Sequence, residues 1–269
     1  MNVFSLGGSR NIGYLSALRM LDAGCTVTFL VRSLATLQDD EAMSKYINAG
    51  KAFLVKGDAL VKSDVGNGWK KAGERGPVDL LLFTVGGTPK VHLTKGFVIE
   101  PGNLVTQSLL NVMTTIPTSQ PQPKMIIISS NGLTKTSHDA LPCLMKPFYA
   151  HFLAIPHKDK VGVERIVHHV AGWEWNTKDD GEPEESILPP TWKETPGLPK
   201  AASLNQIMVI RPAFLTDGAC EAEKGKGYKV SEGDLGGYTI SRRDVAHLVA
   251  DAALNNWEKY GDKRISISY

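Results

Sequence analysis

A glycine-bearing turn near the start of the chain holds the first residues whose types and spacing suggest chemistry. It follows a short apolar segment, residues 1–6, and leads into a segment with helical spacing. Glycine lets the backbone approach a phosphate group closely, and the N-terminus of a helix offers unpaired N–H groups to an anion. The turn therefore predicts the phosphate-binding site of a dinucleotide fold. Its candidate ligand contacts are Gly7, Ser9, Arg10, Asn11, Ile12 and Gly13.

The turn departs from the strict G-x-G-x-x-G pattern. Gly7 and Gly13 occupy the outer positions, but Arg10 and Asn11 stand where an inner glycine is expected. A tight strand-to-helix turn without a ligand is therefore an alternative interpretation. The rest of the chain agrees with the phosphate site.

The two residues that directly follow the second predicted strand, 26–31, indicate which dinucleotide the fold accepts. NAD-selective folds place an acidic residue there to bind the ribose hydroxyls, whereas this chain has Arg32 followed by Ser33. An arginine can hold a 2′-phosphate through a bidentate, charge-assisted contact, and Arg10 could reach the same phosphate. Two cations at one site favour NADP over NAD. The alternative is that both arginines are only solvated.

Two further strand ends supply candidate cofactor contacts. Asp58 and Ala59 follow the third predicted strand, where a polar residue commonly faces the adenine edge in such folds. Asp58 is equally interpretable as a turn residue or a helix cap. Val85 and Gly86 follow a nearly continuous apolar run, typical of a strand buried on both faces, whose end could approach the cofactor ribose.

The elements that must position these residues alternate between strands and helices. Short apolar or β-branched runs predict strands, and segments with apolar residues at helical spacing separate them. This alternation specifies an α/β fold: a doubly wound parallel sheet (Rossmann fold) with right-handed crossovers, in which ligands bind outside the carboxyl ends of the strands. The strands are expected at 1–6, 26–31, 52–55, 78–83, 125–128, 207–212 and, as an exposed edge strand, 265–268.

One segment departs from this alternation. Residues 172–204 contain three tryptophans, an acidic cluster and several prolines. A long irregular segment in a compact domain is usually a disordered insertion or a lid over a site, and the tryptophans favour a partly packed lid. We therefore expect a single NAD(P)-binding domain over 1–269, with 172–204 as an irregular lid or insertion and a small substrate-side region toward the C-terminus.

Composition argues against several classes of protein. The chain has 269 residues, 42% of them hydrophobic, and a formal net charge of +2, without the basic run of a nucleic-acid surface. No apolar segment approaches the length of a membrane span. Because the first strand begins at Met1, we expect no cleavable leader and a cytoplasmic protein. The three cysteines suit a reducing compartment, and no histidine has a partner at metal-ligand spacing, so no metal is expected.

Several segments together resemble the short-chain dehydrogenase/reductase superfamily. They are the 7–13 turn, Arg32, Ser129-Ser130, Arg211-Pro212-x-x-Leu215-Thr216 and Ser241-Arg-x-Asp244-Val-Ala246. The chain is more similar to the atypical branch, the NAD(P)H-binding proteins related to NmrA and to flavin and biliverdin reductases. The resemblance covers nearly the whole chain apart from 172–204, and it implies a Rossmann fold, a nicotinamide cofactor and reductase chemistry.

The resemblance also implies a catalytic group with one member missing. Carbonyl reductases of the superfamily use a Tyr-x-x-x-Lys pair, whose tyrosine is the acid, and a serine that hydrogen-bonds the carbonyl. Lys160 matches the lysine, as a catalytic residue and ribose contact, but Pro156 stands where the tyrosine is expected. Ser129 can orient a carbonyl. Tyr149 or His157 could replace the acid; the alternatives are a helix-packing tyrosine and a surface histidine.

These observations lead to one main hypothesis and two alternatives. We expect an NADPH-dependent reductase that passes hydride to a small conjugated carbonyl or quinone-like acceptor beneath the tryptophan-rich segment. The first alternative is a non-catalytic, NmrA-like regulator that senses NADP(H) and binds a protein partner through 172–204. The second is an isomerase or lyase with a tightly held cofactor and no net oxidation. We expect a small-molecule substrate, no nucleic acid and no membrane as partners, and the oligomeric state is open.

Overall fold

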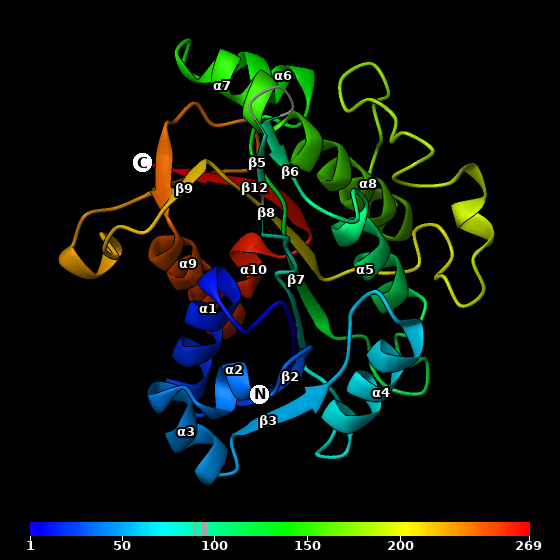
Figure 1. Cartoon of the computed structure of the whole chain (residues 1–269), viewed down its shortest axis with the longest axis vertical. Coiled ribbons are helices and arrows are strands. Elements are labelled where there is room, and N and C mark those ends of the chain that lie inside the picture. Colours follow the sequence, from blue (N-terminus) through cyan, green and yellow to red (C-terminus); the bar gives the residue numbers. More distant parts are fainter. Residues whose placement is uncertain (89, 93–95) are drawn as a thin grey trace.

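The computed structural model describes residues 1–88, 90–92 and 96–269. Within these residues, eight strands form one sheet that has helices on both faces (Figure 1). The strand order is β10-β12-β8-β7-β4-β1-β2-β3, and every neighbouring pair is parallel except β10 with β12. This arrangement confirms the predicted doubly wound parallel sheet.

The strands of this sheet are short and mostly apolar. In the central strand β4 every residue is buried, as expected for a parallel sheet that helices cover on both faces. The bounds are β1 Asn2–Leu6, β2 Thr26–Val31, β3 Ala52–Lys56, β4 Leu80–Phe83, β7 Lys124–Ile128, β8 Ile207–Pro212, β10 Lys229–Ser231 and β12 Lys263–Ser268.

The helices divide between the two faces and enclose two apolar cores. One core joins β1, β2 and β8 to α1 and α9, and the other joins β4 and β7 to α4, α5 and α8. Alternate residues of a strand therefore belong to opposite cores, as Val3 and Phe4 of β1 do. The helices are α1 Asn11–Asp22, α2 Ala35–Gln38, α3 Glu41–Asn48, α4 Lys62–Gly73, α5 Leu104–Met113, α6 Lys135–Asp139, α7 Met145–Phe152, α8 Ala154–Ala171, α9 Arg242–Leu254 and α10 Trp257–Tyr260.

The prediction that 265–268 forms an exposed edge strand is wrong. β12 lies between β8, to which it is parallel, and β10, to which it is antiparallel. Ser266 and Ser268 are accordingly buried. The strand β10 that covers this edge has only three residues, too few to give a periodic signal in the sequence.

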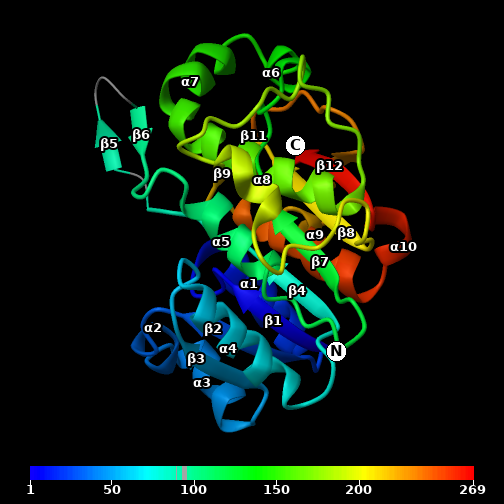
Figure 2. The same cartoon turned by 90° about the vertical axis from the view of Figure 1, so that its right-hand side faces the viewer.

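Two smaller sheets lie beside the main one. β5 (Lys90–His92) and β6 (Gly96–Val98) form an antiparallel hairpin that projects from the main body (Figure 2). The start of β6 approaches the end of α7, because a Cβ added to Gly96 would lie 2.3 Å from the carbonyl oxygen of His151. β9 (Phe214–Thr216) and β11 (Thr239–Ser241) pair in parallel and lead the chain into α9.

The start of α9 explains one segment of the family resemblance in structural terms. Ser241 is the N-cap, and its Oγ accepts the backbone N–H of Asp244 at 2.9 Å. The carboxylate of Asp244 accepts the backbone N–H groups of Glu221 and Ala222 at 3.1 and 3.0 Å. It also accepts the hydroxyl of Tyr269. Asp244 therefore fixes the loop before β10 and the end of the chain to α9.

The irregular segment 172–204 packs on the outside of α5 and α8, where the right of Figure 1 shows it. Its regular structure is one short 3-10 helix, Pro190–Glu194. Leu188 and Trp192 are buried in the same core as α8. Asp180 is also buried and accepts from Nη1 of Arg264 on β12 at 3.1 Å. The segment is thus held to the body by both apolar contacts and an ion pair.

Candidate functional site

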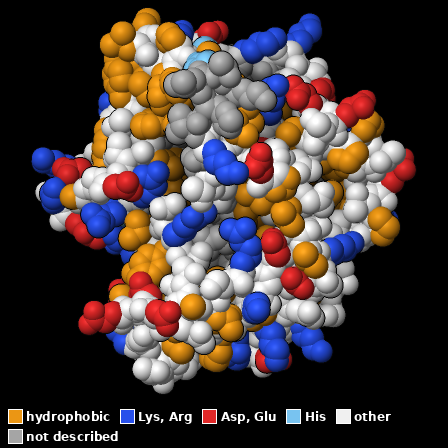
Figure 3. All heavy atoms as spheres, viewed as in Figure 1, with side chains coloured by type: hydrophobic (Ala, Val, Ile, Leu, Met, Phe, Trp, Pro, Cys, Tyr) orange, Lys and Arg blue, Asp and Glu red, His pale blue; other side chains and the backbone are white. Residues whose placement is uncertain are grey.

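A cavity of about 500 Å³ lies at the carboxyl ends of the strands. Its walls are the turns that follow β1, β2, β3, β4 and β7, together with residues from α5, α8, β9 and α9. Lys and Arg side chains gather across the middle of the face shown in Figure 3. The cavity has the size and position of a small-molecule site in an open α/β sheet.

The glycine turn holds the start of α1 against β4. Gly7 has φ +81°, and a Cβ there would lie 2.5 Å from the carbonyl carbon and oxygen of Thr84. A Cβ on Gly13 would lie 2.2 Å from Oγ1 of the same threonine. Close packing therefore requires glycine at both positions.

The beginning of α1 faces the cavity, and its first N–H groups have no hydrogen-bond partner among the residues that the structure describes. Arg10 is the N-cap residue and makes no side-chain cap, and the first turn contains no acidic residue. Such an end can bind an anion. Of the six predicted contacts in this turn, Gly7, Ser9, Arg10, Asn11 and Ile12 line the cavity, whereas Gly13 is buried behind them.

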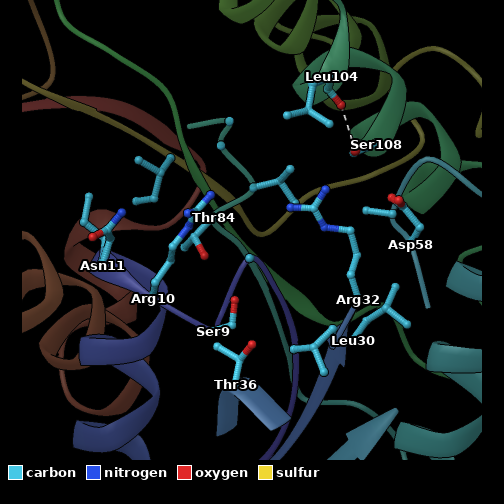
Figure 4. Close-up of a pocket in the computed structure, with 18 of the residues that line it drawn as sticks. Ser9, Arg10, Asn11, Leu30, Arg32, Thr36, Asp58, Thr84, Leu104 and Ser108 are labelled. Atoms are coloured by element: carbon cyan, nitrogen blue, oxygen red, sulfur yellow. Dashed lines mark hydrogen bonds between the residues drawn. The ribbon is translucent and has the colours of Figure 1, made fainter. Parts of the chain in front are cut away.

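Two arginines give the cavity a positive charge at the β1 and β2 side. Arg10 and Arg32 are both exposed, and neither has a hydrogen-bond or ion-pair partner within the residues described. Figure 4 shows both side chains extending into the cavity from neighbouring turns. Ser33 and Thr36 line the same region. The charge and hydroxyl groups form a suitable set of donors for a phosphate monoester.

The turns after β3 and β4 complete this side of the cavity. Asp58 lines it and is also a turn residue, since its Oδ1 accepts the backbone N–H of Leu60 at 2.9 Å. The two interpretations of Asp58 are therefore compatible. Ala59, Val85 and Gly86, the other predicted cofactor contacts in these turns, also line the cavity.

Lys160 lines the opposite end of the cavity, beside β7. Its Nζ donates to the carbonyl oxygen of Ile128, the last residue of β7, at 2.7 Å. Burial lowers the pKa of Lys160 to about 8, and the charges of Asp159 and Glu164 oppose that shift. Asp159 holds this part of α8 to α5, because its carboxylate accepts the N–H of Val105 at 2.8 Å.

Ser129 also lines the cavity, and it contacts a buried ion pair that sequence reasoning missed. Its hydroxyl donates to Oε1 of Glu164 on α8. Arg211 on β8 donates to both oxygens of the same carboxylate, at 2.9 and 2.6 Å. The ion pair explains the arginine of the Arg-Pro segment. The signal available in the sequence was Glu164, a charged residue beside the apolar stripe of a predicted helix.

The structure does not bring Tyr149 to the cavity. The side chain is 2% exposed and packs against Gly132, whose added Cβ would lie 2.8 Å from its ring. Burial raises the pKa of Tyr149 to about 12. His157 is equally unsuited as an acid, because burial lowers its pKa to about 3 and keeps the ring neutral at physiological pH. The ring Nε2 lies 3.2 Å from Oγ of Ser130.

Several lining residues come from positions that were not predicted. Those near strand ends agree with the rule that ligands bind at the carboxyl ends of parallel strands, which also located the predicted residues. The residues of α5, β9 and α9 reach the cavity only through tertiary packing. The additional residues are Leu30, Val31, Thr36, Gly57, Thr84, Gly87, Leu104, Ser108, Ile128, Leu215 and Arg242.

Other classes of site have little support in the residues that the structure describes. They contain no group of three or more His, Cys, Asp or Glu side chains arranged to hold a metal ion. No helix among them is both long enough and apolar enough to cross a membrane. None of the residues that line the cavity belongs to 172–204.

Comparison with known proteins supports this assignment of the fold. No family model matches the chain. A curated relative, the reductase pytE of Aspergillus terreus, is 27% identical over 203 residues, which are 71% of this chain and 67% of the relative. The chain is similar to short-chain dehydrogenases/reductases.

Solved structures of a reductase and of a short-chain dehydrogenase match over almost the whole chain. The anaerobillin reductase ChuY of Escherichia coli O157:H7 has a TM-score of 0.58 and 16% identity, covering 99% of this chain and 96% of its own. A short-chain dehydrogenase of Burkholderia cenocepacia J2315, solved in complex with NADP, has a TM-score of 0.60 and 15% identity, with the same coverage. At these identities the likeness establishes the Rossmann fold, in agreement with the sequence motifs.

Proposed function

We propose that this chain is an NADPH-dependent oxidoreductase of the atypical short-chain type. The observation that carries the proposal is the unpaired Arg32, which lies in one cavity with the uncapped start of α1. A helix end that suits a pyrophosphate and a cation one strand away that suits a 2′-phosphate match the two anionic parts of NADP. The reductase relative and the NADP-bound structure of the same fold support this proposal.

The lining residues fit the cofactor along its length. Arg32, Ser33, Thr36 and Arg10 would hold the 2′-phosphate, and the start of α1 would hold the pyrophosphate. Asp58 and Ala59 would lie at the adenine. Oδ1 of Asp58 accepts the N–H of Leu60, and Oδ2, which accepts no hydrogen bond within the described residues, would be available to the base. The other end of the cofactor would lie across Val85, Gly86, Ser129 and Lys160.

Lys160 is the group in the cavity wall that can hold and release a proton. The bond to Ile128 uses one of its three N–H groups, which leaves two for a ribose hydroxyl and the acceptor. The pKa of about 8 keeps the ammonium protonated at neutral pH and lowers the cost of giving up the proton. The cofactor, when bound, supplies the hydride. Lys160 would supply the proton to the reduced oxygen and recover it from water.

The acceptor would approach past an aromatic cluster on α7, β6 and β9, the last of which contributes Leu215 to the cavity wall. Phe148 stacks on Phe152 with ring centroids 5.0 Å apart and meets Phe214 edge-on at 5.2 Å, and Phe97 of β6 lies 5.6 Å from Phe152. Phe214 precedes Leu215, which lines the cavity. Partly exposed aromatic rings favour a flat, conjugated carbonyl or quinone-like acceptor. We therefore propose that the acceptor binds by α7 and β9 and not beneath 172–204, which contributes no residue to the cavity wall and would be a packed insertion.

Replacement of Arg32 tests the cofactor assignment. We expect Arg32→Asp to weaken NADPH binding about 10- to 100-fold and NADH binding little, because the change removes a charge-assisted contact to the 2′-phosphate alone. Calorimetric titration with both nucleotides measures this. Arg243→Asp, which makes the same charge change at an exposed site outside the cavity, is the control. Equal losses for the two nucleotides would contradict the proposal.

One observation favours the regulatory alternative, a protein that senses NADP(H) and binds a protein partner. None of the residues that line the cavity is a tyrosine, so the usual acid of the superfamily is missing from the described site. NADPH oxidation with a panel of quinones and aldehydes decides between the two. Tight NADPH binding without turnover of any acceptor would support the regulator.

The compartment follows from the same proposal. All three cysteines, Cys25, Cys143 and Cys220, are free thiols, which suits the reducing cytoplasm where NADPH is abundant. We therefore propose a cytoplasmic protein.

A further inference from the structure

The hydroxyl proton of Ser129 is already used inside the protein. Oγ donates to Oε1 of Glu164, and that carboxylate also receives Nε and Nη2 of Arg211 at 2.9 and 2.6 Å. The side chains of Glu164 and Arg211 are each 2% exposed. The ion pair is therefore a rigid, solvent-excluded support behind the cavity wall.

Glu164 can only accept in this arrangement. Burial raises the pKa of its carboxyl group, but the charge of Arg211 outweighs burial, and the pKa falls to about 2. The proton in the hydrogen bond between Ser129 and Glu164 accordingly belongs to the hydroxyl of Ser129. A serine hydroxyl has one proton and two lone pairs, so the part of Ser129 that remains for a ligand consists of lone pairs. Within the described residues, no group donates a hydrogen bond to them.

The position of Ser129 identifies the part of the ligand that it would meet. It follows β7, which is three strands from β2, where Arg32 lies. Adjacent strands are about 4.8 Å apart, so the two residues stand roughly 14 Å apart across the sheet. A dinucleotide with its 2′-phosphate at Arg32 and its pyrophosphate at α1 reaches Ser129 with its nicotinamide end.

We propose that Ser129 accepts a hydrogen bond from the carboxamide N–H of the nicotinamide, with Glu164 as the positioning residue that directs its lone pairs into the cavity. The inference rests on the proposed function, because it takes the cofactor from there. It reverses the role expected from the family resemblance, in which Ser129 donates to a carbonyl. A carbonyl oxygen placed against these lone pairs would be repelled.

The test compares NADP⁺ with 3-acetylpyridine adenine dinucleotide phosphate, which keeps the carbonyl of the amide and replaces its NH₂ by a methyl group. Calorimetric titration of the wild type should give a preference for NADP⁺ of about tenfold, the change that one hydrogen bond supports. Ser129→Ala should abolish this preference, and Ser129→Thr, which keeps a hydroxyl, should retain it.

Ser130→Ala is the matched control. Its hydroxyl lies 3.2 Å from His157 and outside the cavity, so the preference should remain at the wild-type value. Glu164→Gln, measured where its melting curve shows a folded protein, should reduce the preference, because an amide can donate to Ser129 and occupy a lone pair. A purely structural role would leave the ratio of the two affinities unchanged.

The outcomes separate the inference from the proposed function. If Ser129→Ala weakens both nucleotides equally, Ser129 donates to the shared carbonyl and the inference is overturned. The inference is also overturned if the wild type binds both nucleotides equally, or if Ser129→Ala keeps the preference. If the wild type binds neither nucleotide, the proposed function itself fails.

Discussion

The two ends of the cavity are built in different ways. At the end beside β1 and β2, residues contribute from positions that follow their own strand: Arg10 and Asn11 after β1, and Arg32 after β2. At the other end, Ser129 depends on Glu164 from α8 and Arg211 from β8, which are 35 and 82 positions further along the chain (129 to 164, 129 to 211). The first end is determined locally, and the second depends on long-range packing.

The largest expected effect comes from a substitution at the end of the cavity that depends on long-range packing. Glu164→Gln leaves the guanidinium of Arg211 buried without its main charge partner, so we expect it to lower the free energy of unfolding by about 3–5 kcal/mol. The control is Glu184→Gln, which breaks an exposed ion pair with Lys158, a residue of α8 like Glu164. This variant should change the free energy of unfolding by no more than about 1 kcal/mol. Urea denaturation of both variants measures the difference. A loss below about 1 kcal/mol for Glu164→Gln would mean that this end does not depend on the ion pair.

A smaller effect should come from a substitution at the end of the cavity that is determined locally. In Gly13→Ala the new Cβ would lie 2.2 Å from Oγ1 of Thr84, so we expect overpacking to cost about 1–3 kcal/mol. Gly66→Ala is the control, because Gly66 is also inside a helix and its nearest neighbour is 3.9 Å away. That variant should gain up to about 1 kcal/mol from helix propensity. The same sign for both variants in thermal melts would contradict the close packing of α1 on β4.

A third expected effect sharpens the comparison through pH. The pKa of Lys160 falls from 10.5 in the unfolded chain to about 8 in the folded one, so between these values the unfolded chain binds more protons. The destabilising effect of the buried charge is complete below pH 8 and disappears toward pH 10.5. We therefore expect the stability of the wild type relative to Lys160→Met to rise over this range, as measured by urea midpoints. A constant difference would show that the ammonium is fully hydrated.

The contrast between the two ends of the cavity also explains which site residues could be predicted from the sequence. Arg32 was found because the end of a strand in a βαβ unit is recognisable from its local pattern, and the sheet geometry then places it at the cavity. The glycine turn was found for the same reason, although Gly13 serves packing instead of lining the cavity. The fold followed from the alternation of elements, each of which is local.

Tyr149 could not be placed in this way. The sequence indicates a helix around it, but neither the direction of α7 nor the side chains opposite it can be obtained from spacing. The phenol ring packs against Gly132, and Tyr149 is not among the residues that line the cavity. Leu104, Ser108 and Arg242 were missed for the same reason, since their distance from the cavity depends on how α5 and α9 pack.

The position of β12 has a consequence for how the protein is made. This strand comes last in sequence among the described strands of the main sheet and leaves the ribosome after them, yet it is an interior member of the sheet, between β8 and β10. Until it is synthesised, β8 presents an unpaired apolar edge, and nascent chains that lack 263–268 offer a template for pairing with one another. Premature termination before residue 263 should therefore yield aggregates, and chaperone demand during translation should persist until this strand has been made.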